Sequence, residues 1–153
     1  MPYISHVSWK RKTPTFDVKT YDRTHTVRFG GGFPFEASSA PEFSGNANLP
    51  NPEELFIAAI SSCFMLTFLY LAATNKLIVD EYTAEASGLL GKNSEGKMAI
   101  TEVFIRPKIA FHENKNPELA VLDQLLKKAH EACFISSSVK TNIKVEPALT
   151  TIS

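Results

Sequence analysis

The two cysteines, Cys63 and Cys133, are the residues of this 153-residue chain best suited to chemistry. They are too few for a disulfide-rich scaffold, and with four scattered histidines they do not match zinc-ligand spacings, so we expect no metal site. Each lies on an apolar helical segment, where a cysteine is more often a small core residue than a reactive one. If the two helices pack together, the thiols could come within disulfide range, which would make the pair a candidate redox centre.

A reactive cysteine works as its thiolate, and apolar surroundings raise the pKa of a thiol. We therefore expect a cation near Cys63, and arginine is best suited because it keeps its charge when desolvated. Alternation along a strand predicted at 24–29 places Arg23 on the inward face with Val27, which makes Arg23 the first candidate, although an ion pair at the sheet edge would fit as well. The other arginines are Arg11, which is the reserve candidate, Arg28 and Arg106.

An inward-pointing arginine needs a carboxylate to hold its guanidinium group. Glu53 and Glu54, at the start of the longest predicted helix, are the candidates. Acidic residues in a first helical turn also stabilise the helix dipole without any catalytic role, so both interpretations stay open.

The predicted helix that carries Cys63 has the clearest sequence signals in the chain. Residues 51–54 (Asn-Pro-Glu-Glu) predict its start, with an N-cap asparagine, a proline at the first position and a glutamate at the third. No charged residue follows between Leu55 and Asn75, a length that could span a bilayer. Four hydroxyl residues and the absence of a flanking Lys/Arg cluster favour a buried helix over a membrane span. One small subunit cannot cover all its sides, so we expect a dimer.

The order of the remaining elements predicts the fold class. Strands grouped between helices indicate an α+β fold with antiparallel pairs, in a single domain covering 1–153. We expect strands at 4–10, 15–21, 24–29, 79–90, 98–111 and 139–145, an irregular connection at 33–50 and a second helix starting at 116–118.

The composition excludes several classes of protein. With 44% hydrophobic and 21% charged residues the chain is not expected to be disordered. Its formal net charge of zero argues against a nucleic-acid partner. The first twelve residues lack the apolar core of a signal peptide, so we expect a cytoplasmic protein.

Two segments resemble the signature of a known family. Residues 51–64 (NPEELFIAAISSCF) and 129–139 (AHEACFISSSV) are similar to the two cysteine segments of the OsmC/Ohr family of thiol-dependent hydroperoxide reductases. The order of elements also matches over nearly the whole chain. The resemblance implies antiparallel sheets around a long buried central helix, in an intertwined homodimer with its sites at the subunit interface.

The same resemblance implies roles for individual residues. Cys63 would attack an organic hydroperoxide and become a sulfenic acid, Cys133 would resolve it as a disulfide, and Glu53 would position an arginine. A dithiol reductant, of the lipoyl type or another thiol, would reopen the disulfide, and no cofactor is implied. Many relatives place the catalytic arginine in an N-terminal turn or in the loop before the Asn-Pro-Glu segment. Because 29–105 contains no arginine, we assign the role to Arg23.

We therefore expect a cytoplasmic, dimeric antioxidant peroxidase that takes organic hydroperoxides. The alternative is a dimer of the same fold that binds an apolar small molecule while Cys63 is unreactive. An apolar substrate pocket is expected from phenylalanines near the site: Phe33, Phe35, Phe43, Phe56 and Phe64.

Helix geometry adds one expectation about the site. Glu53 and Cys63 are ten residues apart, which corresponds to about 15 Å along a straight helix. No glycine or proline lies between them to break the helix. We therefore expect a composite site with Glu53 and Arg23 from one chain and both cysteines from the other.

Overall fold

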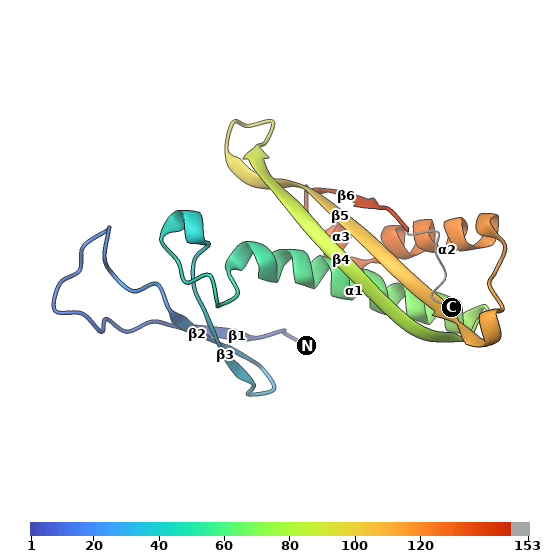
Figure 1. The fold of residues 1–153 in the computed structure, drawn as a ribbon, viewed down its shortest axis with the longest axis horizontal. Helices are drawn as coiled ribbons and strands as arrows, with labels where there is room; N and C mark the ends of the chain where they lie inside the picture. The colour runs from blue at the N-terminus through green and yellow to red at the C-terminus, as the bar shows by residue number, and fades with distance from the viewer. Residues whose placement is uncertain (148–153) are drawn as a thin grey trace. The chain divides into compact units, whose positions relative to one another are not determined.

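The computed structural model describes residues 1–147 of the chain, which form two compact units, 1–56 and 57–147. The α+β class expected from the sequence is confirmed, with two three-stranded sheets and helices (Figure 1). The single domain expected over 1–153 stays a prediction, and each unit is described by itself.

The N-terminal unit is built on a small antiparallel sheet of order β1-β2-β3 (Figure 1). Val27 of the middle strand lies opposite Val7 on one side and Phe35 on the other, and Val27 is buried. The loop after β3 contains a buried serine, Ser38, and a close approach at Gly45, where any Cβ would overlap the carbonyl of Ser39. The elements are β1 (Ser5–Ser8), β2 (His25–Phe29), β3 (Pro34–Ala37) and the 3-10 turn η1 (Pro41–Phe43).

One strand prediction and one loop prediction in this unit are wrong. Residues 15–21 form a turn instead of a strand, because Asp17 accepts hydrogen bonds from the backbone N–H of Lys19 (2.8 Å, side chain) and of Tyr21 (2.9 Å, carbonyl). The connection predicted as irregular at 33–50 contains β3, whose short length and leading proline give little strand signal. The prediction at 24–29 is nearly correct, but Arg23 lies outside β2.

Helix α1 (Pro52–Thr74) begins as its sequence predicts. Asn51 Oδ1 accepts a hydrogen bond from Glu54 N at 2.9 Å, and Glu54 Oε2 accepts one from Asn51 N at 3.2 Å. This reciprocal pair is a capping box, so Glu54 has a structural role at the helix start.

The second unit contains most of α1, a long antiparallel hairpin and two further helices. The hairpin crosses α1 (Figure 1), and the Phe68 and Tyr82 rings make contact with centroids 6.0 Å apart. Its core is formed by Ile60, Phe64, Phe68 and Ala72 of α1 with apolar residues of the hairpin and of the second helix. The elements are β4 (Val79–Lys92), β5 (Met98–Phe111), η2 (His112–Asn114), α2 (Leu119–Ala132), α3 (Phe134–Ser137) and β6 (Asn142–Val145).

The last strand and the second helix differ from the predictions in detail. β6 pairs parallel with β5, not antiparallel, and starts at Asn142 because the residues before it form α3 and a turn. α2 starts at Leu119, with Glu118 as its N-cap residue, so the cap expected at Asn116 does not form.

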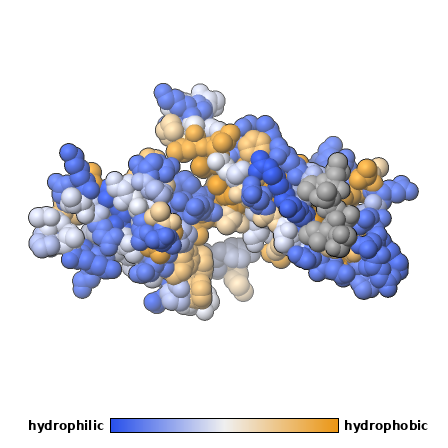
Figure 2. Space-filling model, in the orientation of Figure 1, coloured by the Kyte–Doolittle hydropathy of each residue, from blue (hydrophilic) through white to orange (hydrophobic). Residues whose placement is uncertain are grey.

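As expected from the sequence, a single chain does not bury helix α1 on all its sides. Its buried residues follow a single stripe, and only 22% of its most apolar window is buried. By length and composition alone it could cross a membrane. Apolar residues reach the visible surface of the molecule (Figure 2, orange), and on α1 the exposed ones include Leu66 (61%) and Tyr70 (68%).

Candidate active site

The two thiols lie together in the second unit. Cys63 is in the middle of α1, and Cys133 is the residue that joins the end of α2 to the start of α3. Cys63 is half-buried, whereas Cys133 has no exposed surface. Both are free thiols, and their side chains lie close enough for each to shift the pKa of the other. The expectation that the two helices bring the thiols together is therefore met.

Local hydrogen bonds fix the backbone around each cysteine. Thr67 Oγ1 donates to the carbonyl of Cys63 one turn earlier in α1, at 2.9 Å. Cys133 has an extended backbone (φ −71°, ψ 115°) that ends α2, and its Sγ accepts a hydrogen bond from Ser136 N at 3.5 Å. Ser137 Oγ donates to the Cys133 carbonyl at 3.1 Å. The serine-rich sequence after Cys133 thus forms a short turn of helix with the sulfur as its cap.

The environment of Cys63 favours its thiolate. Burial acts to raise the pKa of the Cys63 thiol, but hydrogen bonds from the Cys133 thiol, the backbone N–H groups of Ile135 and Phe134 and the Thr67 hydroxyl outweigh it. The pKa of Cys63 is therefore lowered below its ordinary value. A cation was expected here from the sequence, whereas the contributions that lower the pKa of Cys63 within the chain are hydrogen bonds.

The environment of Cys133 acts in the opposite direction. Burial raises the pKa of the Cys133 thiol, and the hydrogen bond with Cys63 raises it further. Contacts with the hydroxyl and N–H of Ser136 lower the pKa by less. The two environments therefore shift the pKa values in opposite directions, that of the half-buried Cys63 downward and that of the buried Cys133 upward, so the thiolate is favoured at Cys63 over Cys133.

Glu53 lies in the first turn of α1 beside the capping box. Its Oε2 atom is buried and has no hydrogen-bond partner among residues 1–147. A buried carboxylate oxygen without a hydrogen-bond donor destabilises the fold. Glu53 is therefore suited to accept a hydrogen bond from a group outside residues 1–147 of its own chain.

Arg23 lies in the loop before β2, half-buried and close to the ring of Tyr21. Its guanidinium carbon is 4.0 Å from the Tyr21 ring centroid, and its nitrogens donate to the carbonyls of Tyr21 (2.8 Å) and Val18 (2.7 Å). Within residues 1–147 it forms no ion pair with a carboxylate. Arg23 is thus oriented by backbone acceptors and an aromatic ring rather than by strand alternation.

The other three arginines either donate hydrogen bonds to nearby residues or are exposed to solvent. Arg11 donates to the carbonyls of Thr13 and Pro14 in an exposed turn. Arg106, on β5, donates hydrogen bonds to the Glu146 carboxylate and to the Ser87 hydroxyl. Arg28 is exposed, as the sequence predicted.

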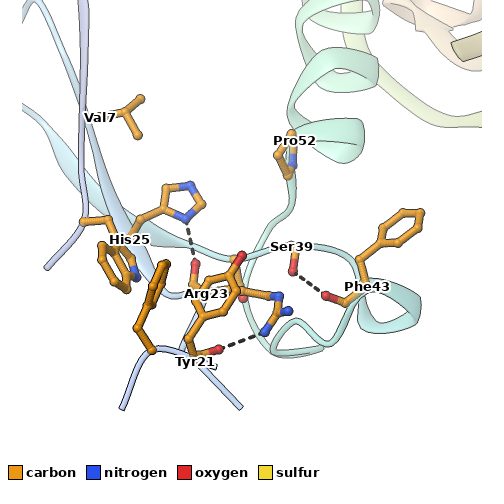
Figure 3. Close-up of a pocket in the computed structure, with 10 residues that line it drawn as sticks. Val7, Tyr21, Arg23, His25, Ser39, Phe43 and Pro52 are labelled. Atoms are coloured by element: carbon orange, nitrogen blue, oxygen red, sulfur yellow. Dashed lines mark hydrogen bonds between the residues drawn. The ribbon is translucent and has the colours of Figure 1, made fainter. Parts of the chain in front are cut away.

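A pocket of about 580 Å³ surrounds Arg23 in the N-terminal unit, and we call it the aromatic pocket (Figure 3). In Figure 3, His25 lies on one side and Phe43 on the other, with Tyr21 and Arg23 between them and Pro52 at the start of α1. Its polar residues are Arg23, His25, Ser38 and Ser39, and its apolar walls are Val7, Trp9, Phe16, Tyr21, Phe43 and Pro52.

Of the five phenylalanines predicted for a substrate pocket, Phe43 lines the aromatic pocket. Phe64 is fully buried in the core of the second unit, and Phe33 is 68% exposed next to the β2–β3 turn. Phe35 pairs with Phe29, with ring centroids 5.6 Å apart, and Phe56 is half-buried on α1. Contact of these four with a substrate stays a prediction.

Three residues that line the aromatic pocket were not predicted from the sequence: Trp9, Phe16 and Tyr21. They lie between the short strands β1 and β2 at spacings that follow neither a helical nor a strand period, so only the folded loop brings them together. A possible signal was the concentration of aromatic residues before Arg23. No group of His, Cys, Asp or Glu that could hold a metal occurs among the described residues.

The comparisons with known proteins assign the family. The model of the OsmC-like protein family matches residues 45–148, so the chain belongs to the OsmC-like family. A solved OsmC-like protein of unknown function from Vibrio cholerae is 40% identical, covers 97% of this chain and 99% of its own, and has a TM-score of 0.92. The resemblance stated from the two cysteine segments is confirmed.

Two hydroperoxide resistance proteins share the fold at lower identity. The protein from Elizabethkingia anophelis is 22% identical over 99% of this chain and 96% of its own, with a TM-score of 0.73. OhrB of Bacillus subtilis is 19% identical over 97% and 98%, with a TM-score of 0.69. The uncharacterised protein YmaD of Bacillus subtilis is 23% identical over 69% of this chain and 70% of its own.

Proposed function

We propose that the protein is a cytoplasmic, thiol-dependent peroxidase that reduces organic hydroperoxides. One observation supports this most directly: the interaction of the half-buried Cys63 with the buried Cys133 thiol lowers the pKa of Cys63 and raises that of Cys133. Membership of the OsmC-like family and the fold shared with hydroperoxide resistance proteins support a peroxide-related redox role.

The reaction balances with these two residues and a dithiol. The Cys63 thiolate attacks the outer peroxide oxygen, the O–O bond breaks, and the departing alkoxide takes a proton to become the alcohol. The Cys133 thiol then attacks the sulfenic sulfur, which forms a disulfide and releases water. A dithiol reductant, of the lipoyl type or another thiol, donates two electrons and restores both thiols.

Glu53 and Arg23 complete the proposed site. Glu53 has a buried oxygen without a donor, and Arg23 has no carboxylate partner within residues 1–147. A guanidinium held by a carboxylate would further favour the thiolate and stabilise the departing alkoxide. We propose that Glu53 and Arg23 of one subunit act on the two cysteines of the other in a homodimer, which would also cover the exposed face of α1.

Peptide mapping tests the two-cysteine cycle. After treatment with equimolar cumene hydroperoxide under non-reducing conditions, we expect a disulfide between Cys63 and Cys133 within one protomer. Cys133→Ser protein should stop at the sulfenic acid and then overoxidise. Stable overoxidised Cys63 beside a free Cys133 in the unmodified protein would contradict the resolving role.

A second candidate function is a binding module for an apolar small molecule. The aromatic pocket favours it, because none of the residues that line this pocket is a cysteine. In that case, peroxide would leave both thiols unchanged and Cys63 would react with thiol reagents no faster at mildly acidic pH than an ordinary cysteine.

A further inference from the structure

Three rings in the aromatic pocket form a continuous surface, which we call the aromatic cluster: Trp9, Phe16 and Tyr21. Their centroids are 5.6 Å apart for Trp9–Phe16, 5.2 Å for Phe16–Tyr21 and 6.1 Å for Trp9–Tyr21. The planes are tilted or edge-on, the arrangement in which ring edges meet ring faces. Phe16 is 69% exposed, so the cluster keeps free ring surface.

The polar end of the aromatic pocket is Arg23. The guanidinium lies over the Tyr21 ring, next to the cluster, and two of its nitrogens are used by backbone carbonyls. The remaining N–H donors of this group are available to a ligand oxygen. His25 Nδ1 contacts the Arg23 carbonyl at 2.9 Å, which orients the histidine ring at the same end of the pocket.

We propose that the aromatic cluster is the subsite for the organic group of the substrate and that it selects hydroperoxides carrying an arene. The proposal rests on the proposed peroxidase function and specifies its substrate class. The arene would pack against the cluster while the peroxide oxygens lie at the Arg23 end of the pocket.

The geometry favours a ring over a saturated group of the same size. Both would gain from apolar contact, because the walls of the pocket are apolar. Only an arene adds edge-to-face contacts with three rings already arranged at suitable separations. The volume of about 580 Å³ holds a substituted arene with room to spare, whereas hydrogen peroxide would make none of these contacts.

Binding can be measured without turnover because Trp9 is the only tryptophan of the chain. Titration of Cys63→Ser protein with 2-phenylpropan-2-ol, the alcohol formed from cumene hydroperoxide, should change the Trp9 fluorescence. The saturated analogue 2-cyclohexylpropan-2-ol should bind about two- to tenfold more weakly, the range that aromatic pairs supply.

Matched variants locate the preference. Phe16→Leu should remove most of the difference between the two alcohols, since it keeps apolar volume but removes one ring. Phe29→Leu is the control, because Phe29 pairs with Phe35 and does not line the pocket. Equal affinity for the two alcohols in the unmodified protein, or a preference unchanged by Phe16→Leu, would overturn the subsite.

Turnover separates this inference from the function on which it rests. The ratio of kcat/KM for cumene hydroperoxide to that for tert-butyl hydroperoxide should fall about two- to tenfold in Phe16→Leu and stay unchanged in Phe29→Leu. Turnover without any such preference would overturn the subsite and leave the peroxidase. Arene binding without peroxide turnover would overturn the hydroperoxide as ligand and the proposed function together.

Discussion

Cys63 shows how a thiolate can be favoured on an apolar helix without a charge from its own chain. The helix face around it raises the pKa of the thiol, and four hydrogen-bond donors lower it again by more. Because the folded-state pKa lies below the unfolded value, ionised Cys63 stabilises the fold above the unfolded pKa, and this contribution is lost as pH falls through the folded pKa. The thiolate fraction should therefore persist to lower pH than in an ordinary cysteine.

The Thr67 hydroxyl is the side-chain donor whose contribution is simplest to isolate; its one proton points to the Cys63 carbonyl and turns to the sulfur when the thiol ionises. Thr67→Val keeps the shape but removes the hydrogen bond, so at neutral pH alkylation of Cys63 by iodoacetamide should slow by up to roughly tenfold, the equivalent of about 1.5 kcal/mol for a bond to a charged group. The pH profile of alkylation should move toward higher pH.

Thr67→Ser is the matched control, since it restores the hydroxyl and should return the profile to that of the unmodified protein. Thr74→Val removes another hydroxyl that bonds backbone carbonyls of α1, and it should leave Cys63 unaffected. A profile unchanged in Thr67→Val would mean that the backbone N–H groups and Cys133 alone set the pKa of Cys63.

The sequence predicts the two cysteines of the site better than it predicts the arginine. Cys63 and Cys133 could be found because helical periodicity places both on inward faces, and the structure brings their side chains together. Arg23 was selected by strand alternation, yet it lies in a loop and is oriented by contacts with Val18 and Tyr21. Loop contacts of this kind have no period, so sequence patterns cannot show them.

The elements were predictable where their signals are local. The start of α1 is set by Asn51 and Glu54, four residues in sequence, and the structure has the expected capping box. The parallel pairing of β6 with β5 joins residues about 40 positions apart, as in Glu102 opposite Asn142. Its direction depends on the path of α2 and α3 between the strands, which no short pattern encodes.

The two Asn-Pro-Glu segments allow a matched test of capping. Asn51→Ala removes the side-chain acceptor of the α1 capping box and should lower the free energy of unfolding by about 1 kcal/mol. Asn116→Ala changes the corresponding residue before α2, where Glu118 is the N-cap residue and has no side-chain cap bond, so it should have little effect. Urea denaturation measures both. Equal losses would show that Asn116 stabilises α2 by a contact other than capping.

Within one chain, helix α1 is buried along one side only. The buried residues of α1 recur every four positions from Ile60 to Ala72, while Ser62, Leu66 and Tyr70 are exposed on other sides. Exposed apolar surface of this kind in a soluble protein marks an interface. We expect a dimer at micromolar concentration in sedimentation experiments without detergent.

A charged substitution on that surface should weaken the dimer. Leu66→Glu, at a residue that is 61% exposed in the chain, should shift the sedimentation profile toward monomer. Leu119→Glu, at a residue of similar exposure (67%) on α2, is the control and should leave the profile unchanged. A stable, well-folded monomer of the unmodified protein would contradict the dimer, and solubility that depends on detergent would favour a membrane span by α1.

The proposed dimer would also determine how the site is assembled. α1 is one continuous helix of 23 residues, so Glu53 and Cys63 are separated by about 15 Å along it and by roughly 80° around it. A guanidinium held by Glu53 therefore cannot also contact Cys63 of the same helix. Within residues 1–147, Glu53 has a buried oxygen without a hydrogen-bond partner and Arg23 forms no ion pair with a carboxylate, as expected if both act on the cysteines of another subunit.

Subunit complementation tests this composite site. Glu53→Ala and Cys63→Ser proteins should each have little peroxidase activity alone. After mixing under conditions that allow subunit exchange, a mixed dimer carries one site with Glu53 and Arg23 from the Cys63→Ser chain and both cysteines from the Glu53→Ala chain. Because that site has all its native residues, activity should return toward one functional site per mixed dimer. If exchange is verified by mass-tagged subunits and no activity returns, each site is built within one chain, and Glu53 must act on Cys63 through a bend in α1 or through an intervening group.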